Sequence, residues 1–359
     1  MKIFRVLILS ILCFHCKEDK PITRQLPPFE ENVMALKYAE GFKINNSASS
    51  STIEITKAWP ETEKKYTYLL LTKEQASKTT YNKADYDGVI ITPISKTVVT
   101  STTHIPALEL LGVEETLVGF PGTDYVSSKK TRTLIDNKKV RELGKNEGIN
   151  TEVLLNLNPD AVIGFGVDGV NKTFETIKKA GIPVIYNGDW VESSALAKAE
   201  WIKFFGALFN KEKEADSIFN KIETDYLEAK KIAKQAKTQP TVLSGAMHKD
   251  VWYLPNGSSS EAQFLKDANV NYIWSETTGN GSLALSFEAV FDKAKNADLW
   301  LSPSYYSSFE QLKNVNALYT NFEAFKSKDI YTFSNTRDRW SFVLRTRHSK
   351  ARFGFKRSH

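Results

Sequence analysis

The chain has 359 residues, of which 41% are hydrophobic, 12% aromatic and 25% charged. This composition is typical of a globular protein and excludes a disordered chain or one of many membrane spans, and the length suffices for two domains. The formal charge of +6 is concentrated in residues 337–359, which hold eight Lys or Arg and one acid, so the remainder is nearly neutral. A neutral body argues against nucleic acid as a partner.

Residues 1–16 have the features of an export signal. Lys2 and Arg5 precede a short apolar run, and Cys16 follows it. The run is too short for a membrane span and is typical of a cleaved signal peptide. We therefore expect an exported protein.

The position of Cys16 resembles that of the lipidated cysteine of bacterial lipoproteins, because a polar segment with prolines follows it. The resemblance implies that Cys16 carries a lipid and that residues 17–32 form a tether. His15 departs from the small residue that lipoproteins favour there, and an ordinary signal peptide is the alternative. The other cysteine, Cys13, lies in the signal as well, so we expect no internal disulfide.

Residues 33–193 form the predicted first lobe. Residues 41–94 contain β-branched and aromatic runs separated by turn residues, which predicts an antiparallel β apron. From Thr97, apolar strands alternate with helices that end at Gly112 and Gly181. This alternation predicts an α/β lobe with parallel strands and helices on its faces.

Residues 194–237 carry no strand signal and are predicted to be helical. Apolar residues recur there at helical spacing, at Ala215, Ile218, Phe219, Ile222, Tyr226, Ala229 and Ala233. A helix of some 26 residues would be about 39 Å long, enough to join two lobes, although a helix on the surface of one domain has the same pattern. Alternation resumes in residues 238–336, the predicted second α/β lobe.

A short pattern occurs twice. Residues 151–166 and 287–304 each have an acid in the first turn of a short apolar helix, an Asn-x-Asp stop and an apolar strand. Glu152 and Glu288 occupy equivalent positions in the two copies. A first-turn acid usually does no more than interact favourably with the helix dipole.

The order of these motifs resembles a known family. "VVTSTTHIPALELLGVEETLVGF", "NTEVLLNLNPDAVIGFG", "AGIPVIY", the long helix and "VWYLPNGSSSEAQFLKDANVNYIW" are similar to the substrate-binding proteins of ABC importers for iron chelates and cobalamin, over residues 97–335. The resemblance implies two α/β lobes joined by one rigid helix, with a ferric siderophore, haem or cobalamin bound between them. It also implies no catalysis, no intrinsic cofactor, a monomer, and a lipid-anchored place in the bacterial cell envelope, in the periplasm or on the cell surface.

The same resemblance implies a partner for the repeated acid. In this family one surface glutamate on each lobe meets arginines of the membrane permease, and Glu152 and Glu288 stand at the matching positions. Carboxylates fixed near helix N-termini can form charge-assisted bonds to arginine. We expect these two residues to dock the protein on ABC permease subunits.

The ligand site is expected at the carboxyl ends of the strands, where open α/β sheets bind ligands. The loops concerned are residues 101–104, 121–128, 164–169, 186–190, 244–257 and 302–308. Aromatic residues among small polar ones suit a large, flat, partly apolar ligand, although each aromatic could fill the core instead, and His104 could make a local hydrogen bond. The predicted ligand-binding residues are Thr103, His104, Tyr125, Phe165, Trp190, Trp252, Tyr253 and Tyr305.

Other functions fit the sequence less well. A direct zinc or manganese binder needs several His and carboxylate ligands, and the body has only His104 and His248. A hydrolase needs a nucleophile elbow or an acid–base pair, which "GSLALS" and "NGSSSE" do not match. A surface-binding adhesin without a transporter stays an alternative, but it has no permease for Glu152 and Glu288 to meet.

Residues 337–359 differ from the rest of the chain, because they lack helical or strand periodicity. The family usually closes with a Gly-rich turn and a Pro-Asp-Leu helix, and codons for residues 351–358, shifted by one nucleotide, can encode Pro-Asp-Leu-Val-Leu-Lys-Asp-Leu. We therefore expect a frameshift or sequencing error beginning near Arg337. A natural basic tail that binds a membrane or partner is the alternative.

Overall fold

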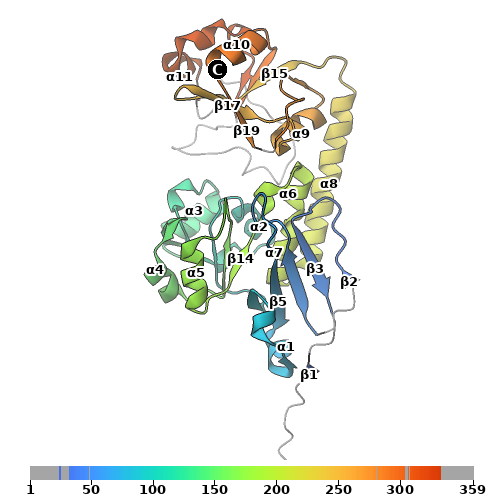
Figure 1. The fold of residues 1–359 in the computed structure, drawn as a ribbon, viewed down its shortest axis with the longest axis vertical. Coiled ribbons are helices and arrows are strands. Elements are labelled where there is room, and N and C mark those ends of the chain that lie inside the picture. Colours follow the sequence, from blue (N-terminus) through green and yellow to red (C-terminus); the bar gives the residue numbers. More distant parts are fainter. Residues whose placement is uncertain are drawn as a thin grey trace, which may run out of the picture.

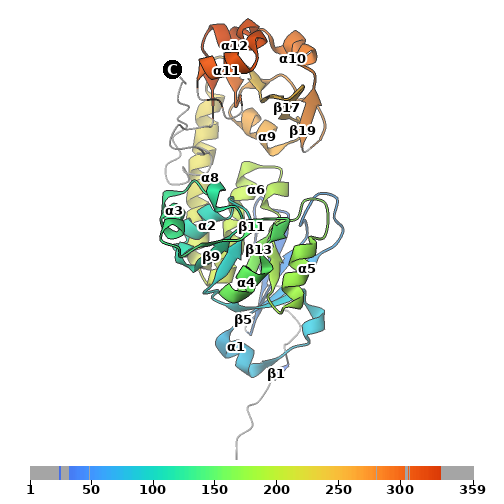
Figure 2. The same cartoon turned by 90° about the vertical axis from the view of Figure 1, so that its left-hand side faces the viewer.

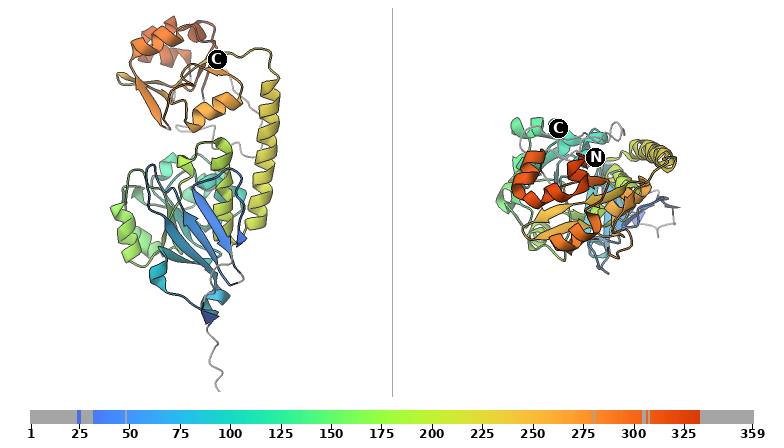
Figure 3. Two further views of the ribbon diagram at one scale, coloured as in Figure 1. Left: turned by 45° about the vertical axis from the view of Figure 1, so that its right-hand side comes forward. Right: turned by 90° about the horizontal axis from the view of Figure 1, so that it is seen from above.

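The computed structural model describes residues 24–25, 32–47, 49–279, 281–303, 306 and 308–332. Two α/β lobes lie one above the other, and helix α8 (Glu212–Lys234) runs beside both (Figures 1 and 3). This confirms the predicted fold class. Residues 1–16, almost all of 17–32, and 337–359 lie outside the described part of the chain, so the predicted signal, tether and tail do as well.

The first lobe contains a parallel sheet in the order β10-β9-β8-β13-β14. The chain starts at the central strand β8, moves outward to β9 and β10, and returns to the other side of β8 for β13 and β14. The loops after β8 and β13 therefore diverge, which opens a crevice at their carboxyl ends. The strands are β8 (Thr97–Val99), β9 (Leu117–Phe120), β10 (Arg141–Glu142), β13 (Ala161–Gly164) and β14 (Val184–Tyr186). The helices of this part are α2 (Ile105–Leu110), α3 (Lys129–Asp136), α4 (Thr151–Leu157) and α5 (Lys172–Lys179).

The second lobe repeats this arrangement with a parallel sheet in the order β18-β15-β20-β21, which again begins at an inner strand. Its strands are β15 (Thr241–Ser244), β18 (Asn271–Tyr272), β20 (Leu299–Leu301) and β21 (Ile330–Tyr331). An antiparallel sheet adds β16 (Ala246–His248), β17 (Val251–Pro255) and β19 (Ser282–Leu285). The helices are α9 (Ser260–Asp267), α10 (Phe287–Ala294), α11 (Phe309–Val315) and α12 (Glu323–Lys326).

The repeated Asn-x-Asp stop joins neighbouring strands. The Asp160 carboxylate, just before β13, accepts hydrogen bonds from the Ser95 and Lys96 amides at 2.8 and 2.9 Å, just before β8. The Asp298 carboxylate, just before β20, accepts from the Thr241 amide and hydroxyl at 2.7 Å each, at the start of β15. In both lobes the aspartate thus aligns the two strands that flank the crevice.

The β apron is a five-stranded sheet in the order β2-β3-β4-β5-β7. Its strands are β2 (Asn32–Val33), β3 (Phe42–Asn46), β4 (Ser51–Ile55), β5 (Tyr66–Thr72) and β7 (Gly88–Thr92). The prediction of a wholly antiparallel apron is wrong at its last strand, because β7 pairs with β5 in parallel. A parallel neighbour needs a crossover, and helix α1 (Lys73–Lys78), which begins at a capping box of Thr72 and Gln75, lies in it.

Helix α8 has the predicted apolar stripe. Ala215 and Phe219 are fully buried, and the other residues of the stripe are partly buried. Its 23 residues correspond to about 35 Å. The first half packs on α7 (Ile202–Phe209), which is buried throughout. The second half binds α9 of the second lobe through Tyr226 and Lys230, which both contact Asp267.

Two buried carboxylates hold the N-terminal segment to the first lobe. Glu200, the last residue of α6 (Ala195–Glu200), is fully buried and accepts hydrogen bonds from the backbone amides of residues 37–39 at 2.8 to 3.1 Å. Lys203 donates to the same carboxylate at 3.0 Å. Glu192, also buried, accepts from the backbone amides of residues 40 and 41 at 3.0 and 2.9 Å. These bonds make the apron a part of the first lobe.

Replacing Glu200 should strongly destabilise the protein. Glu200→Ala leaves three backbone amides without their acceptor and leaves the buried Lys203 ammonium with only Asp216, at 3.5 Å. Breaking a buried pair in this way typically costs about 3–5 kcal/mol. Glu228→Ala, at an exposed position on α8, removes the same charge and should change the free energy of unfolding by less than about 0.5 kcal/mol. Urea unfolding at pH 7.5 measures both, and equal values for the two variants would contradict this role for Glu200.

The stabilisation by Glu200 should also depend on pH. Burial alone would raise the pKa of Glu200, but the hydrogen bonds from residues 37–39 and Lys203 outweigh it and lower the pKa below its ordinary 4.5. A lowered pKa in the folded state gives stability that is present above pH 4.5 and is lost on acidification. The difference between wild type and Glu200→Ala should therefore shrink below that pH.

Candidate interlobe binding site

The carboxyl ends of the first-lobe strands face the second lobe. Figures 1 and 2 show α3 and α6 at the end of the first lobe that is next to the second lobe. Ser193 and Ser194 follow β14 closely and line a cavity together with Gly257 and Ser258 of the second lobe. The chain that follows the predicted loop of residues 186–190 thus lies at the boundary between the lobes.

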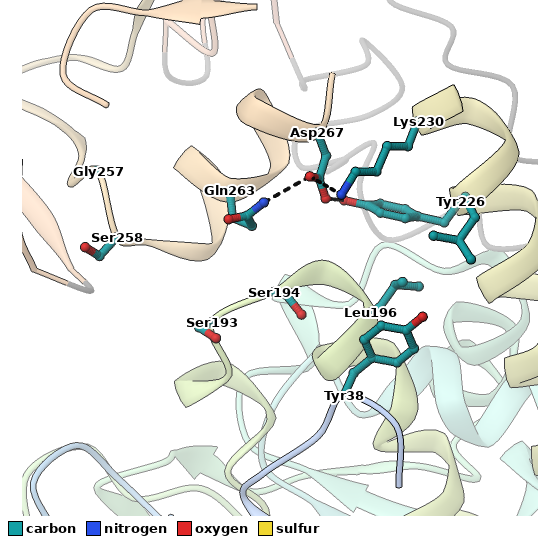
Figure 4. Close-up of a pocket in the computed structure, with 11 residues that line it drawn as sticks. Tyr38, Ser193, Ser194, Leu196, Tyr226, Lys230, Gly257, Ser258, Gln263 and Asp267 are labelled. Atoms are coloured by element: carbon teal, nitrogen blue, oxygen red, sulfur yellow. Dashed lines mark hydrogen bonds and ion pairs between the residues drawn. The ribbon is translucent and has the colours of Figure 1, made fainter. Parts of the chain in front are cut away.

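This cavity has a volume of about 500 Å³, within the usual range for small-molecule sites (Figure 4). It lies beside α8, where the Asp267 carboxylate accepts hydrogen bonds from Tyr226 and Gln263 at 2.8 and 2.9 Å and pairs with Lys230 at 2.7 Å. Hydroxyl, amide and charged groups therefore dominate its wall. Its residues are Tyr38, Ser193, Ser194, Leu196, Tyr226, Leu227, Lys230, Gly257, Ser258, Gln263 and Asp267.

None of the predicted ligand-binding residues lines this cavity. Sequence reasoning missed its wall because it combines the N-terminal segment, α8 and α9, which do not adjoin in the sequence. Two signals pointed to it: Gly257 ends the predicted loop of residues 244–257, and the apolar stripe of α8 includes Tyr226. The cavity is the part of the boundary between the lobes that is next to the connecting helix.

Three loops of the first lobe lie close together. The side chain of Thr103, exposed in the turn before α2, acts to lower the pKa of the Asp189 carboxyl. The Trp190 indole N–H donates to the Gly166 carbonyl at 3.2 Å. The structure therefore brings together Thr103, Trp190 and the loop that contains Phe165.

Exposed apolar side chains occur in or next to the predicted loops of both lobes. Tyr125 is 62% exposed on a 3-10 turn (Thr123–Tyr125) after β9, and Phe165 is partly exposed. Val167 and Val170, in the loop after β13, are also exposed and were not predicted. In the second lobe, Tyr253 is 45% exposed on β17.

Trp252 is not a surface residue, so its prediction as a ligand contact is wrong. It is fully buried, with its ring 5.5 to 5.7 Å from those of Trp300, Tyr319 and Phe322. Successive residues of a strand face opposite sides, so Trp252 points into the core and Tyr253 points outward. Tyr305 lies outside the described residues.

His104 is likewise a core residue, so it is neither the predicted ligand contact nor the alternative, a ring that makes a local hydrogen bond. It is fully buried 5.8 Å from the Phe205 ring, and neither ring nitrogen has a hydrogen-bond partner among the described residues. Burial lowers the pKa of His104 to about 3, so the ring is neutral. The turn before α2 exposes Thr103 and directs His104 beneath the helix.

Glu152 and Glu288 occupy equivalent exposed positions in the first turns of α4 and α10. Asn150 caps the first helix through the Val153 amide at 3.1 Å, and Ser286 caps the second through the Ala289 amide at 3.2 Å. Each helix leads to the strand that lies next to the first strand of the parallel sheet in its lobe, β13 beside β8 and β20 beside β15. Within the described residues, no cluster of three His, Cys, Asp or Glu could hold a metal ion, and no helix there is long and apolar enough to cross a membrane.

The chain belongs to the periplasmic binding protein family, whose model matches residues 98–336 and so ends directly before Arg337. Two uncharacterized lipoproteins of Methanocaldococcus jannaschii are 28% and 26% identical to it, over 71% and 68% of this chain. The matched regions span 63% and 65% of those relatives, less than two thirds of their length.

Solved structures show the same fold. The haem-binding protein HutB of Vibrio cholerae matches with a TM-score of 0.54 at 16% identity, over 67% of this chain and 90% of that one. A possible iron-binding protein of Staphylococcus epidermidis matches with a TM-score of 0.53, the same identity and the same coverage. At these identities the likeness establishes the two-lobed fold of periplasmic binding proteins.

Asp189 should titrate near neutral pH. Burial raises the pKa of Asp189 to about 6, against the opposing effects of Lys198 and Thr103. Because the folded-state pKa lies above the ordinary 3.8, this group should reduce stability as the pH rises from about 4 through 6. Carboxyl carbon NMR should show one aspartate titrating near pH 6 that is absent in Asp189→Asn and still present in Asp124→Asn. A titration near pH 4 for Asp189 would contradict the prediction.

Proposed function

We propose that this chain is an exported binding protein that captures an iron chelate or cobalamin between its lobes and delivers it to an ABC permease. The observation that carries the proposal is the pair of α/β lobes bonded to one helix, with strand carboxyl ends of the first lobe facing the second. Binding proteins of this family act without chemistry on the ligand. The protein is then a receptor rather than an enzyme.

The exposed surface supports a large, partly apolar ligand. Tyr125, Phe165, Trp190 and Tyr253 offer aromatic faces, and Thr103 offers a hydroxyl. A site of this kind covers the faces of a flat ligand and forms hydrogen bonds to its rim. Among proteins of similar fold, HutB binds haem, and one from Saccharomonospora viridis, with a TM-score of 0.50, belongs to an Fe3+-hydroxamate transport system.

The connecting helix favours small movements of the lobes. Glu223, in the middle of α8, accepts hydrogen bonds from Lys37 and Tyr38 of the first lobe. Tyr226, about one turn later, and Lys230, about two turns later, bind Asp267 of the second lobe. A continuous helix resists the sharp backbone rotations of a loop hinge. Ligand capture should therefore close the lobes only slightly.

Anchoring through Cys16 is part of the proposal. Two relatives are named lipoproteins, which supports a lipid at the N-terminus of this chain. The apron, which Glu192 and Glu200 hold to the first lobe, then connects the tether to that lobe. The protein would be held at the membrane that contains its permease, as a monomer.

Tryptophan fluorescence should identify the ligand class. We expect a ferric hydroxamate, haem or cobalamin to quench the emission at micromolar concentration, with less quenching in Trp190→Phe because Trp190 lies at the proposed site. N-acetyltryptophanamide, titrated in parallel, corrects for light absorbed by the ligands. If none of the three quenches while a sugar or a peptide does, the ligand class is wrong.

Docking can be separated from ligand binding. Glu152→Lys and Glu288→Lys should each lower uptake into vesicles that contain the permease, and the double variant should abolish it, because the new cation repels the permease arginines. Ligand affinity should stay unchanged. Glu228→Lys, at an exposed position on α8, is the matched control. Normal uptake by the double variant would favour a surface-binding module without a transporter.

A further inference from the structure

One carboxylate holds the loop that carries Tyr125. Glu142 accepts four hydrogen bonds, from the backbone amides of Gly122, Thr123 and Gly144 at 2.8, 2.6 and 2.7 Å and from the Thr123 hydroxyl at 2.5 Å. Both oxygens take part, each with two donors. The Glu142 residue is exposed to solvent, although its carboxylate is held by these four hydrogen bonds.

The sheet places Glu142 where it can do this. It is the last residue of β10, and it pairs with Phe120, the last residue of β9, so its side chain reaches the turn that follows β9. From the opposite side, the Arg132 guanidinium of α3 donates to the Thr123 carbonyl at 2.7 Å. The turn is therefore fixed by one strand and one helix.

The position of Tyr125 follows from this turn. Gly122 adopts a left-handed conformation with φ of 76°, and its carbonyl accepts from the Tyr125 amide at 3.0 Å. A Cβ on Gly122 would lie 2.9 Å from the Tyr125 ring, so the ring packs directly on this glycine. Moving Gly122 or Thr123 would therefore move Tyr125.

The hydrogen bonds need a charged carboxylate. Burial alone would raise the pKa of Glu142, but the hydrogen bonds from residues 122, 123 and 144 outweigh it and lower the pKa. Glutamine has nearly the same shape but only one oxygen, and its amide group would place a donor against the donors of the loop. Glu142→Gln thus disrupts the turn without changing the volume of the side chain.

We propose that Glu142 is a positioning residue for ligand capture, which acts by presenting Tyr125 to the ligand. This inference rests on the proposed function. Nothing in the sequence around residue 142 indicates it, because the contact requires the pairing of β9 with β10. Glu142 itself need not touch the ligand.

A double-mutant cycle tests the coupling between the two residues. For the ligand that quenches the wild-type protein, Glu142→Gln and Tyr125→Ala should each weaken affinity by roughly tenfold, the loss of one good contact. If Glu142 acts through Tyr125, the double variant should bind as well as Tyr125→Ala alone. Additive losses, or unchanged affinity in Glu142→Gln when Tyr125→Ala binds weakly, would overturn the proposal.

Two further variants exclude a general structural effect. Glu147→Gln makes the same chemical change at an exposed position nearby and should leave affinity unchanged. Thr123→Val removes only the hydroxyl bond and should cost less affinity than Glu142→Gln. Thermal unfolding checks that each variant is folded, and an equal loss of affinity in Glu147→Gln would count against Glu142.

A measurement without ligand separates this inference from the proposed function. Amide hydrogen exchange at Gly122, Thr123 and Gly144 should be slow in the wild type, faster in Glu142→Gln and unchanged in Glu147→Gln. If no ligand of the panel binds but these amides respond, the ligand class fails while the hold on the loop stands. If the amides do not respond, Glu142 does not hold the loop, whatever the ligand.

Discussion

The architecture depends on a helix that both lobes bind. In its first half α8 buries Ala215 and Phe219 in the core of the first lobe. In its second half Tyr226 and Lys230 bind Asp267, and the Ala233 carbonyl accepts from the Asn269 amide group at 3.1 Å. The change of lobe occurs within about one turn, next to the interlobe cavity. The same contacts that join the lobes therefore form part of the wall of the space between them.

Carboxylates that accept backbone amides organise the rest of the chain. Glu200 and Glu192 hold the N-terminal segment, Asp160 and Asp298 align the strands beside each crevice, and Glu142 holds a loop. A charged acceptor forms stronger hydrogen bonds than a neutral one, and one carboxylate can bind several amides. In a chain whose two cysteines both lie within residues 1–16, such contacts connect segments that are distant in sequence.

The success of sequence reasoning differed between levels of structure. The alternation of strands and helices predicted the fold class, because hydrophobic periodicity reflects which face of an element is buried. Prediction of individual side chains was less successful, since Trp252 and Tyr253 are neighbours with the same aromatic character and opposite orientations. The side of the strand that faces the core decides which of the two aromatic residues is buried, and the residues "VWYLP" alone do not reveal that side. The prediction that His104 binds the ligand was wrong for a similar reason. Thr103 and His104 share a turn, but Thr103 is exposed and His104 points into the core.

The sequence by itself determined that this protein has two α/β units in tandem, a long amphipathic helix between them and a repeated acid, stop and strand pattern. These are local properties, set by spacing along the chain. Only the tertiary structure decided that β7 is parallel to β5, that Glu200 meets residues 37–39, and that Glu142 reaches the loop of Tyr125. Each of these depends on which segments become neighbours, and that choice is made by the packing of the whole lobe.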